Sequence, residues 1–117
     1  MLAATSLGAV WSSCSPDFGI KGVLDRFGQI EPKVFIACDA YWYAGKRIDT
    51  SDTVRELAGK LPGLTAVVAI GELPDSISWR ALTAENAPLE FVATPFDHPV
   101  YILYSSGTTG KPKCITH

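Results

Sequence analysis

The chain alternates short, continuously apolar runs with stretches in which apolar residues recur at helical spacing. We predict four strands, at residues 9–13, 33–38, 64–70 and 100–104. Between the strands lie two amphipathic stretches that are typical of helices with one buried face. Buried strands separated by such helices favour a parallel sheet that is covered by helices. We therefore expect a layered α/β/α fold with one mostly parallel sheet and flanking helices.

The first amphipathic helix is predicted to begin at Ser15 and to stop before Pro32. The Ser15 side chain can cap the free amides of the first turn, and Pro16 suits the first helical position. Its apolar stripe consists of Ile20, Val23, Leu24, Phe27 and Ile30.

The second amphipathic helix is predicted to begin at Thr50 or Ser51, either of which can act as its cap. Pro62-Gly63 ends it. Its buried face consists of Val54, Leu57, Ala58 and Leu61.

The remaining segments are less regular. Residues 1–9 look like the end of a helix, residues 71–99 are rich in proline and predict loops, and residues 114–117 look like the start of a strand. Residues 41–49 predict a hairpin around Ala44-Gly45. Its aromatic side chains, Tyr41, Trp42 and Tyr43, could stack on an adenine, but packing within the hairpin or the core is favoured.

Composition excludes several classes of partner. The 117 residues are 47% hydrophobic and carry a formal net charge of -2, which is typical of a soluble globular protein. There is no basic surface for nucleic acid or anionic lipid. No apolar run approaches the ~20 residues that span a bilayer. We therefore expect neither nucleic acid nor membrane as a partner.

The three cysteines, Cys14, Cys38 and Cys114, are odd in number and far apart. Their spacing fits neither a disulfide framework nor a zinc site, so we expect free thiols in a cytoplasmic protein. A catalytic pair of a cysteine with His98 or His117 stays open, although nothing in the local sequence supports it.

The segment from Tyr104 to Lys113 carries the candidate chemistry. An apolar run empties into a loop of hydroxyls, glycines and lysines, which suits a phosphate group. Hydroxyls and free amides donate to phosphate oxygens, glycines allow a close backbone approach, and lysines add positive charge. A solvated linker would share the Ser/Thr/Gly run, but the preceding strand and the Gly-Lys-Pro-Lys exit favour phosphate binding.

A Walker A loop is the first alternative, and it fails at two positions. That pattern requires a glycine where the chain has Ser105, and a serine or threonine where it has Pro112. An atypical P-loop nucleotidase is therefore a distant alternative.

The loop instead resembles the signature [YF]-[ST]-S-G-[ST]-T-G-x-P-K of the adenylate-forming superfamily, and it matches every position. Residues 8–19 and 24–33 further resemble the acetoacetate branch of the acyl-CoA synthetases. The segment Pro112-Lys113-Cys114-Ile115 also looks like that branch, whereas many other relatives have glycine where this chain has Cys114. The resemblance implies a ligase that activates acetoacetate with ATP and Mg²⁺ through an acyl-adenylate and then transfers it to coenzyme A, in ketone-body and lipid metabolism.

The resemblance also implies roles for the loop residues, which would grip the β- and γ-phosphates of ATP. Lys113 is the cation that matches the family pattern, whereas Lys111 occupies a variable position. The hydroxyl donors would be Ser105, Ser106, Thr108 and Thr109, and the flexible positions Gly107 and Gly110. No catalytic residue and no metal ligand is predicted in this chain.

The motifs that such enzymes use for adenine, ribose, magnesium and adenylation cannot be placed in the sequence. We therefore expect residues 1–117 to be a fragment of an AMP-binding N-terminal domain that ends just after the phosphate loop, inactive alone, with the remainder of its own chain as partner. The alternatives are a truncated, non-catalytic phosphate-binding or interaction module, and a ligase of the acetate or short-chain type.

Overall fold

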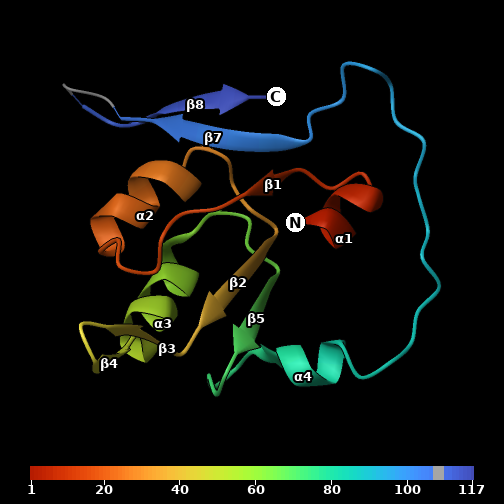
Figure 1. Ribbon diagram of the computed structural model, residues 1–117. Coiled ribbons are helices and arrows are strands. Elements are labelled where there is room, and N and C mark those ends of the chain that lie inside the picture. The colour runs from red at the N-terminus through yellow and green to blue at the C-terminus, as the bar shows by residue number, and fades with distance from the viewer. Residues whose placement is uncertain (107–109) are drawn as a thin grey trace. The chain divides into compact units, whose positions relative to one another are not determined.

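The computed structural model describes residues 1–106 and 110–117. The chain divides into two compact units (Figure 1). The central unit comprises residues 15–86, and the terminal unit combines residues 1–14 with residues 87–117. Both units are built from strands and helices, so the expected α/β class is confirmed.

The central unit contains a parallel three-stranded sheet with the order β2-β5-β6. Its main strands are β2 (Val34–Cys38) and β5 (Ala66–Ile70), which pair in register from Val34–Ala66 to Cys38–Ile70. The short strand β6 (Ile77–Ser78) extends the sheet. Continuous apolar sequence in β2 and β5 thus predicted the parallel pair correctly.

Two helices, α2 (Ile20–Phe27) and α3 (Ser51–Lys60), pack against each other and complete the core of this unit. Phe27 of α2 meets Phe35 of β2 edge to face, with ring centroids 6.1 Å apart. Leu57 of α3 is 2% exposed. The apolar stripes predicted from the sequence therefore supply the core side chains, as expected for helices with one buried face.

Helix α2 begins later than the sequence predicted. The carbonyl of Ser15 accepts the amide of Phe18 in a turn, and Gly19 is the residue that precedes the helix. Arg26 of α2 lies 4.3 Å from the centroid of the Phe18 ring, which packs this turn against the helix. Ser15 is therefore not the helix cap, and Ile30 lies beyond the last helical residue.

Helix α3 starts as predicted, with Thr50 as the residue that precedes it, but the Thr50 side chain makes no capping hydrogen bond. Its hydroxyl donates to the carbonyl of Cys38 at 2.6 Å. Instead the carboxylate of Asp49 accepts the amide of Ser51 at 2.8 Å. A carboxylate at this end also suits the positive end of the helix dipole.

The predicted hairpin is present as β3 (Ala40–Tyr43) and β4 (Lys46–Asp49), which pair antiparallel. Ala44 and Gly45 both have positive φ, 47° and 74°, as a two-residue turn of this kind requires. Trp42 and Tyr43 are 72% and 70% exposed, so the packing expected for the aromatic cluster is wrong for these two.

The stretch predicted as loop contains two short elements that the sequence pattern did not show. They are β6 and the helix α4 (Trp79–Leu82), which contacts β5 and β6. The side chain of Ser78 caps α4 by accepting the amide of Ala81. Elements of two and four residues are too short to produce a periodic pattern.

The terminal unit contains the helix α1 (Leu2–Ser6) and three strands, β1 (Trp11–Ser12), β7 (Tyr101–Ser105) and β8 (Lys113–Thr116). The sheet order is β1-β7-β8, with β1 parallel and β8 antiparallel to β7. The four predicted strands therefore belong to two sheets and not to one. Among the described helices, none is long and apolar enough to cross a membrane.

Candidate functional site

The predicted phosphate loop connects the two strands of the β7–β8 hairpin. Ser105 is the last residue of β7, and it pairs with Lys113, the first residue of β8. We expected an exposed loop from Ser105 to Lys113. The structure corrects both ends of this loop, because Ser105 and Lys113 are strand residues that pair with each other.

The described loop residues are open to solvent. Ser106, Gly110, Lys111 and Lys113 are exposed, and Ser105 is half-buried. Gly110 has a φ of 109°, and among the described residues no atom beyond its chain neighbours lies within 4 Å of where a Cβ would stand. Its backbone conformation therefore favours glycine at this position. Three predicted site residues, Gly107, Thr108 and Thr109, lie outside the described residues.

The loop also occupies a favourable edge of the sheet. β1 and β7 run parallel, and the loop follows the carboxyl end of β7. Open α/β sheets bind ligands beyond the carboxyl ends of their parallel strands. The exposed ammonium groups of Lys111 and Lys113 add positive charge at the same end, which suits an anion.

A hydroxyl pair that the sequence did not predict lies just before this loop. Ser12 of β1 places its Oγ 2.8 Å from the carbonyl oxygen of Ile102 and 3.0 Å from the hydroxyl oxygen of Tyr104. Ser12 and Tyr104 are 92 positions apart in the sequence. No local motif signals a contact over that separation.

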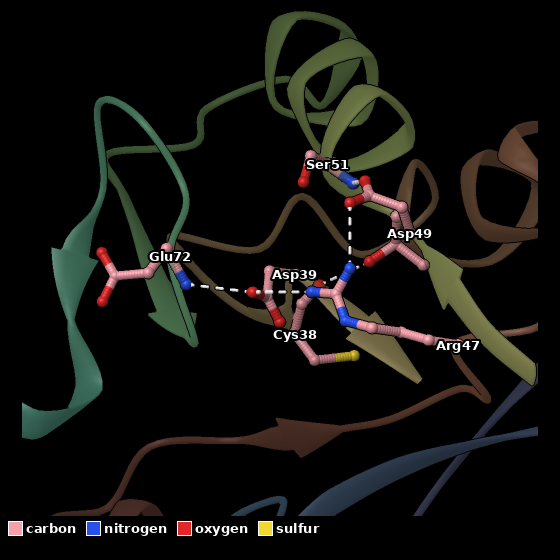
Figure 2. Close-up of polar contacts among 7 residues, drawn as sticks. Cys38, Asp39, Arg47, Asp49, Ser51 and Glu72 are labelled. Carbon is pink, nitrogen blue, oxygen red and sulfur yellow. Dashed lines mark hydrogen bonds and ion pairs between the residues drawn. The ribbon is translucent and has the colours of Figure 1, made fainter. Parts of the chain in front are cut away.

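A second polar cluster lies in the central unit, at the carboxyl ends of β2 and β5 (Figure 2). Asp39 follows β2, and its Oδ2 accepts the amide of Glu72 at 3.2 Å and a guanidinium nitrogen of Arg47 at 3.3 Å. Arg47 also contacts Asp49 at 3.4 Å. The cluster thus joins the end of the sheet, the β3–β4 hairpin and the start of α3.

The surroundings of Asp49 lower the pKa of its carboxyl group. Hydrogen bonds from the amide and the side chain of Ser51 lower the pKa of Asp49, with a further contribution from Arg47. Donors to a carboxylate favour its charged form. The cluster is exposed, with side-chain exposure of 47% for Arg47 and 61% for Asp49, so its ion pairs are screened by water.

The structure gives no support to the cysteine–histidine alternative. Nε2 of His98 lies 2.8 Å from the carbonyl oxygen of Gly8, and the His117 ring contacts the Tyr101 ring. None of the three cysteines, all within the described residues, forms a disulfide. Within residues 1–106 and 110–117, no group of three histidine, cysteine, aspartate or glutamate side chains is arranged to hold a metal ion.

Comparison with known proteins agrees with the family that the sequence of the loop indicates. The family model described as AMP-binding enzyme matches residues 1–117. The acetoacetyl-coenzyme A synthetase of Rhizobium meliloti is 52% identical over the whole chain. The malonamoyl-CoA synthetase vrtB of Penicillium aethiopicum is 42% identical, also over the whole chain. The chain spans 20% of the first relative's length and 18% of the second's.

A solved structure shows the same fold. The acetoacetyl-CoA synthetase from Streptomyces lividans superimposes with a TM-score of 0.94 at 48% identity, over 98% of this chain and 19% of that one. Because the family model covers every residue of the chain, the protein belongs to the AMP-binding enzyme family.

Proposed function

We propose that this chain supplies the phosphate-binding part of an acid–thiol ligase that activates acetoacetate with ATP and passes it to coenzyme A. The β7–β8 hairpin carries the proposal, because it brings Ser105 and Lys113 together at the mouth of a loop whose sequence matches the adenylate-forming signature. The relatives named above as acetoacetyl-CoA synthetases support the choice of reaction.

The chemistry of the first half-reaction explains why such a hairpin is needed. A carboxylate must attack the α-phosphate of ATP, so two anions approach each other. Cations and oriented donors offset that repulsion and hold the departing pyrophosphate. Lys113 would supply charge at the β- and γ-phosphates, and Ser105 and Ser106 would donate hydrogen bonds. Lys111 would add charge from a more variable position.

The described residues do not form a protein-only magnesium site, since no acidic cluster is arranged for one. Mg²⁺ is usually held by one or two carboxylates together with substrate phosphates. The hairpin would bind the phosphates that carry the ion.

We further propose that residues 1–117 form part of one AMP-binding domain, and that the rest of the ligase supplies the sites for adenine, acetoacetate and coenzyme A. A cytoplasmic location, with a role in ketone-body and lipid metabolism, fits three cysteines that form no disulfide and the acetoacetate substrate.

A ligase for a different short acid is the second candidate, because the malonamoyl-CoA synthetase is among the relatives. Acetoacetate and malonamate both carry a carbonyl group two bonds from the carboxyl carbon. In the full-length protein that contains residues 1–117, we expect kcat/KM to favour acetoacetate over both acetate and malonamate. Equal or reversed preference would reject acetoacetate and leave the ligase assignment intact.

The test of the phosphate role replaces Lys113 with alanine. A suitable enzyme is the Rhizobium meliloti relative with its matching segment replaced by residues 1–117. Loss of one charge-assisted contact should slow ATP–pyrophosphate exchange by about 10- to 100-fold. Lys21→Ala removes a lysine that is 88% exposed on α2, and it should leave exchange unchanged. Equal exchange in the Lys113 variant and the parent chimera would reject the role of Lys113.

A further inference from the structure

Two hydroxyl groups join β1 to the residue that precedes the phosphate loop. Ser12 Oγ lies 2.8 Å from the carbonyl oxygen of Ile102 and 3.0 Å from the hydroxyl oxygen of Tyr104, and both contacts are partly buried. A serine hydroxyl has a single hydrogen. When Ser12 donates this hydrogen to the carbonyl of Ile102, Tyr104 can donate its own hydrogen to Ser12 Oγ. Both hydroxyl groups then donate a hydrogen bond.

These contacts begin where the backbone pairing of β1 with β7 ends. The register of the pair closes at Ser12–Ile102, whereas β7 continues to Ser105. Tyr104 lies two residues beyond Ile102, so both side chains lie on the same face of β7. The side chain of Tyr104 contacts Ser12 and thereby extends the contact between β1 and β7 toward the loop.

The two residues that flank the loop, Ser105 and Lys113, lie directly beyond the contact between Ser12 and Tyr104, which we call the tie. Tyr104 pairs with Cys114, and the next pair in the ladder is Ser105–Lys113. A shift of β7 at Tyr104 would therefore move Ser105 and, through the ladder, Lys113. Binding groups lose effect when they move by as little as about 1 Å, so a fixed position for the end of β7 is important for binding a ligand.

We propose that Ser12 is a positioning residue that acts through Tyr104 to fix Ser105 and Lys113 for a polyphosphate ligand. This inference rests on the phosphate-binding function proposed above. It assigns to β1 a task in the site, although β1 itself supplies none of the predicted phosphate contacts.

Three conservative variants of the 117-residue chain test the proposal. Tyr104→Phe keeps the ring and removes the hydroxyl, Ser12→Ala removes its partner, and Ser12→Thr restores a hydroxyl on a residue suited to strands. NMR measures amide exchange at each residue and the affinity for added MgATP in the same samples.

We expect Tyr104→Phe and Ser12→Ala to weaken MgATP binding by about two- to tenfold, which is the worth of one hydrogen bond. Amide exchange should quicken at Cys114 and Lys113, while Val68 of the central sheet, which is 3% exposed, should be unaffected. Ser12→Thr should behave like the unchanged chain. A purely structural role would instead change affinity only as far as it changes the stability of the terminal unit.

The two hypotheses fail in different ways. If the chain binds MgATP and all variants bind it equally, the positioning role is wrong and the phosphate role stands. If the unchanged chain does not bind MgATP while the exchange differences persist, the phosphate role fails and only the tie between the strands remains. If Ser12→Thr binds MgATP as weakly as Ser12→Ala does, the hydroxyl is not the group that positions the site, and the proposal is overturned.

Discussion

At the residue scale, Gly71 shows how a single position can be fixed by both backbone and neighbours. Its φ is 104°, a conformation that side chains disfavour. A Cβ at this position would lie 2.3 Å from the carboxyl carbon of Asp39. Asp39 cannot easily move away, because its carboxylate also holds Arg47 and the amide of Glu72.

We predict that Gly71→Ala destabilises the chain by about 1–3 kcal/mol, since it adds backbone strain to a steric clash. Gly59→Ala is the matched control, because Gly59 lies in α3 and, apart from its own helix, no atom of the described residues lies within 4 Å of where its Cβ would stand. That change should stabilise the helix by about 0.5–1 kcal/mol. Urea denaturation of the two variants measures both effects. A Gly71→Ala chain as stable as the parent would contradict the clash.

At the element scale, the start of α3 depends on a carboxylate from the preceding strand. Asp49 is the last residue of β4, and it accepts the amide of Ser51 in the first turn of the helix. Its lowered pKa has this hydrogen bond as its main cause. A group whose pKa is lowered by folding stabilises the fold above its usual pKa, here 3.8. That stabilisation disappears as the pH falls through the lowered value.

We therefore predict that Asp49→Asn lowers the Tm at neutral pH, and that the difference from the parent shrinks as the pH falls below 3.8. Asp52→Asn is the control, because Asp52 also lies in the first turn of α3 but is 95% exposed and pairs with Arg55. Its Tm should change less. A Tm difference for Asp49→Asn that stays constant down to strongly acidic pH would refute the assigned role of the carboxylate.

At the scale of the whole molecule, the proposed function assigns to this chain one of the several groups that adenylation requires. The hairpin would offer charge and donors to phosphates, whereas binding of adenine and ribose and stabilisation of the α-phosphate are separate contributions. Each contributes its own share of the rate. A chain that supplies one of them is expected to bind its ligand weakly and to turn over nothing.

We predict that the purified 117-residue chain shows no pyrophosphate release above a blank without protein, given ATP, coenzyme A and acetoacetate. Its affinity for MgATP should be in the millimolar range, or about -4 kcal/mol. Turnover that survives repurification and disappears with Lys113→Ala would overturn this expectation, and it would require a second catalytic group among these residues.

The amino-acid sequence by itself determined the α/β class, the main strands, the β3–β4 hairpin and the identity of the candidate phosphate loop. These features depend on local patterns: apolar runs, helical spacing, a two-residue turn and a contiguous signature. The loop roles of Ser105, Ser106, Lys111 and Lys113 remain predictions, as do those of the residues outside the described chain.

Tertiary structure decided what depends on partners distant in sequence. The strands divide between two sheets because strand pairing is set by neighbours in space. α2 starts at Ile20, and the turn before it packs on the helix. The Thr50 hydroxyl points to the carbonyl of Cys38, and the carboxylate of Asp49 accepts the amide of Ser51 at the start of α3. The tie from Ser12 to Tyr104 spans 92 positions and leaves no periodic trace. Such contacts form only when the fold brings their two halves together, and that is the physical reason the sequence pattern did not reveal them.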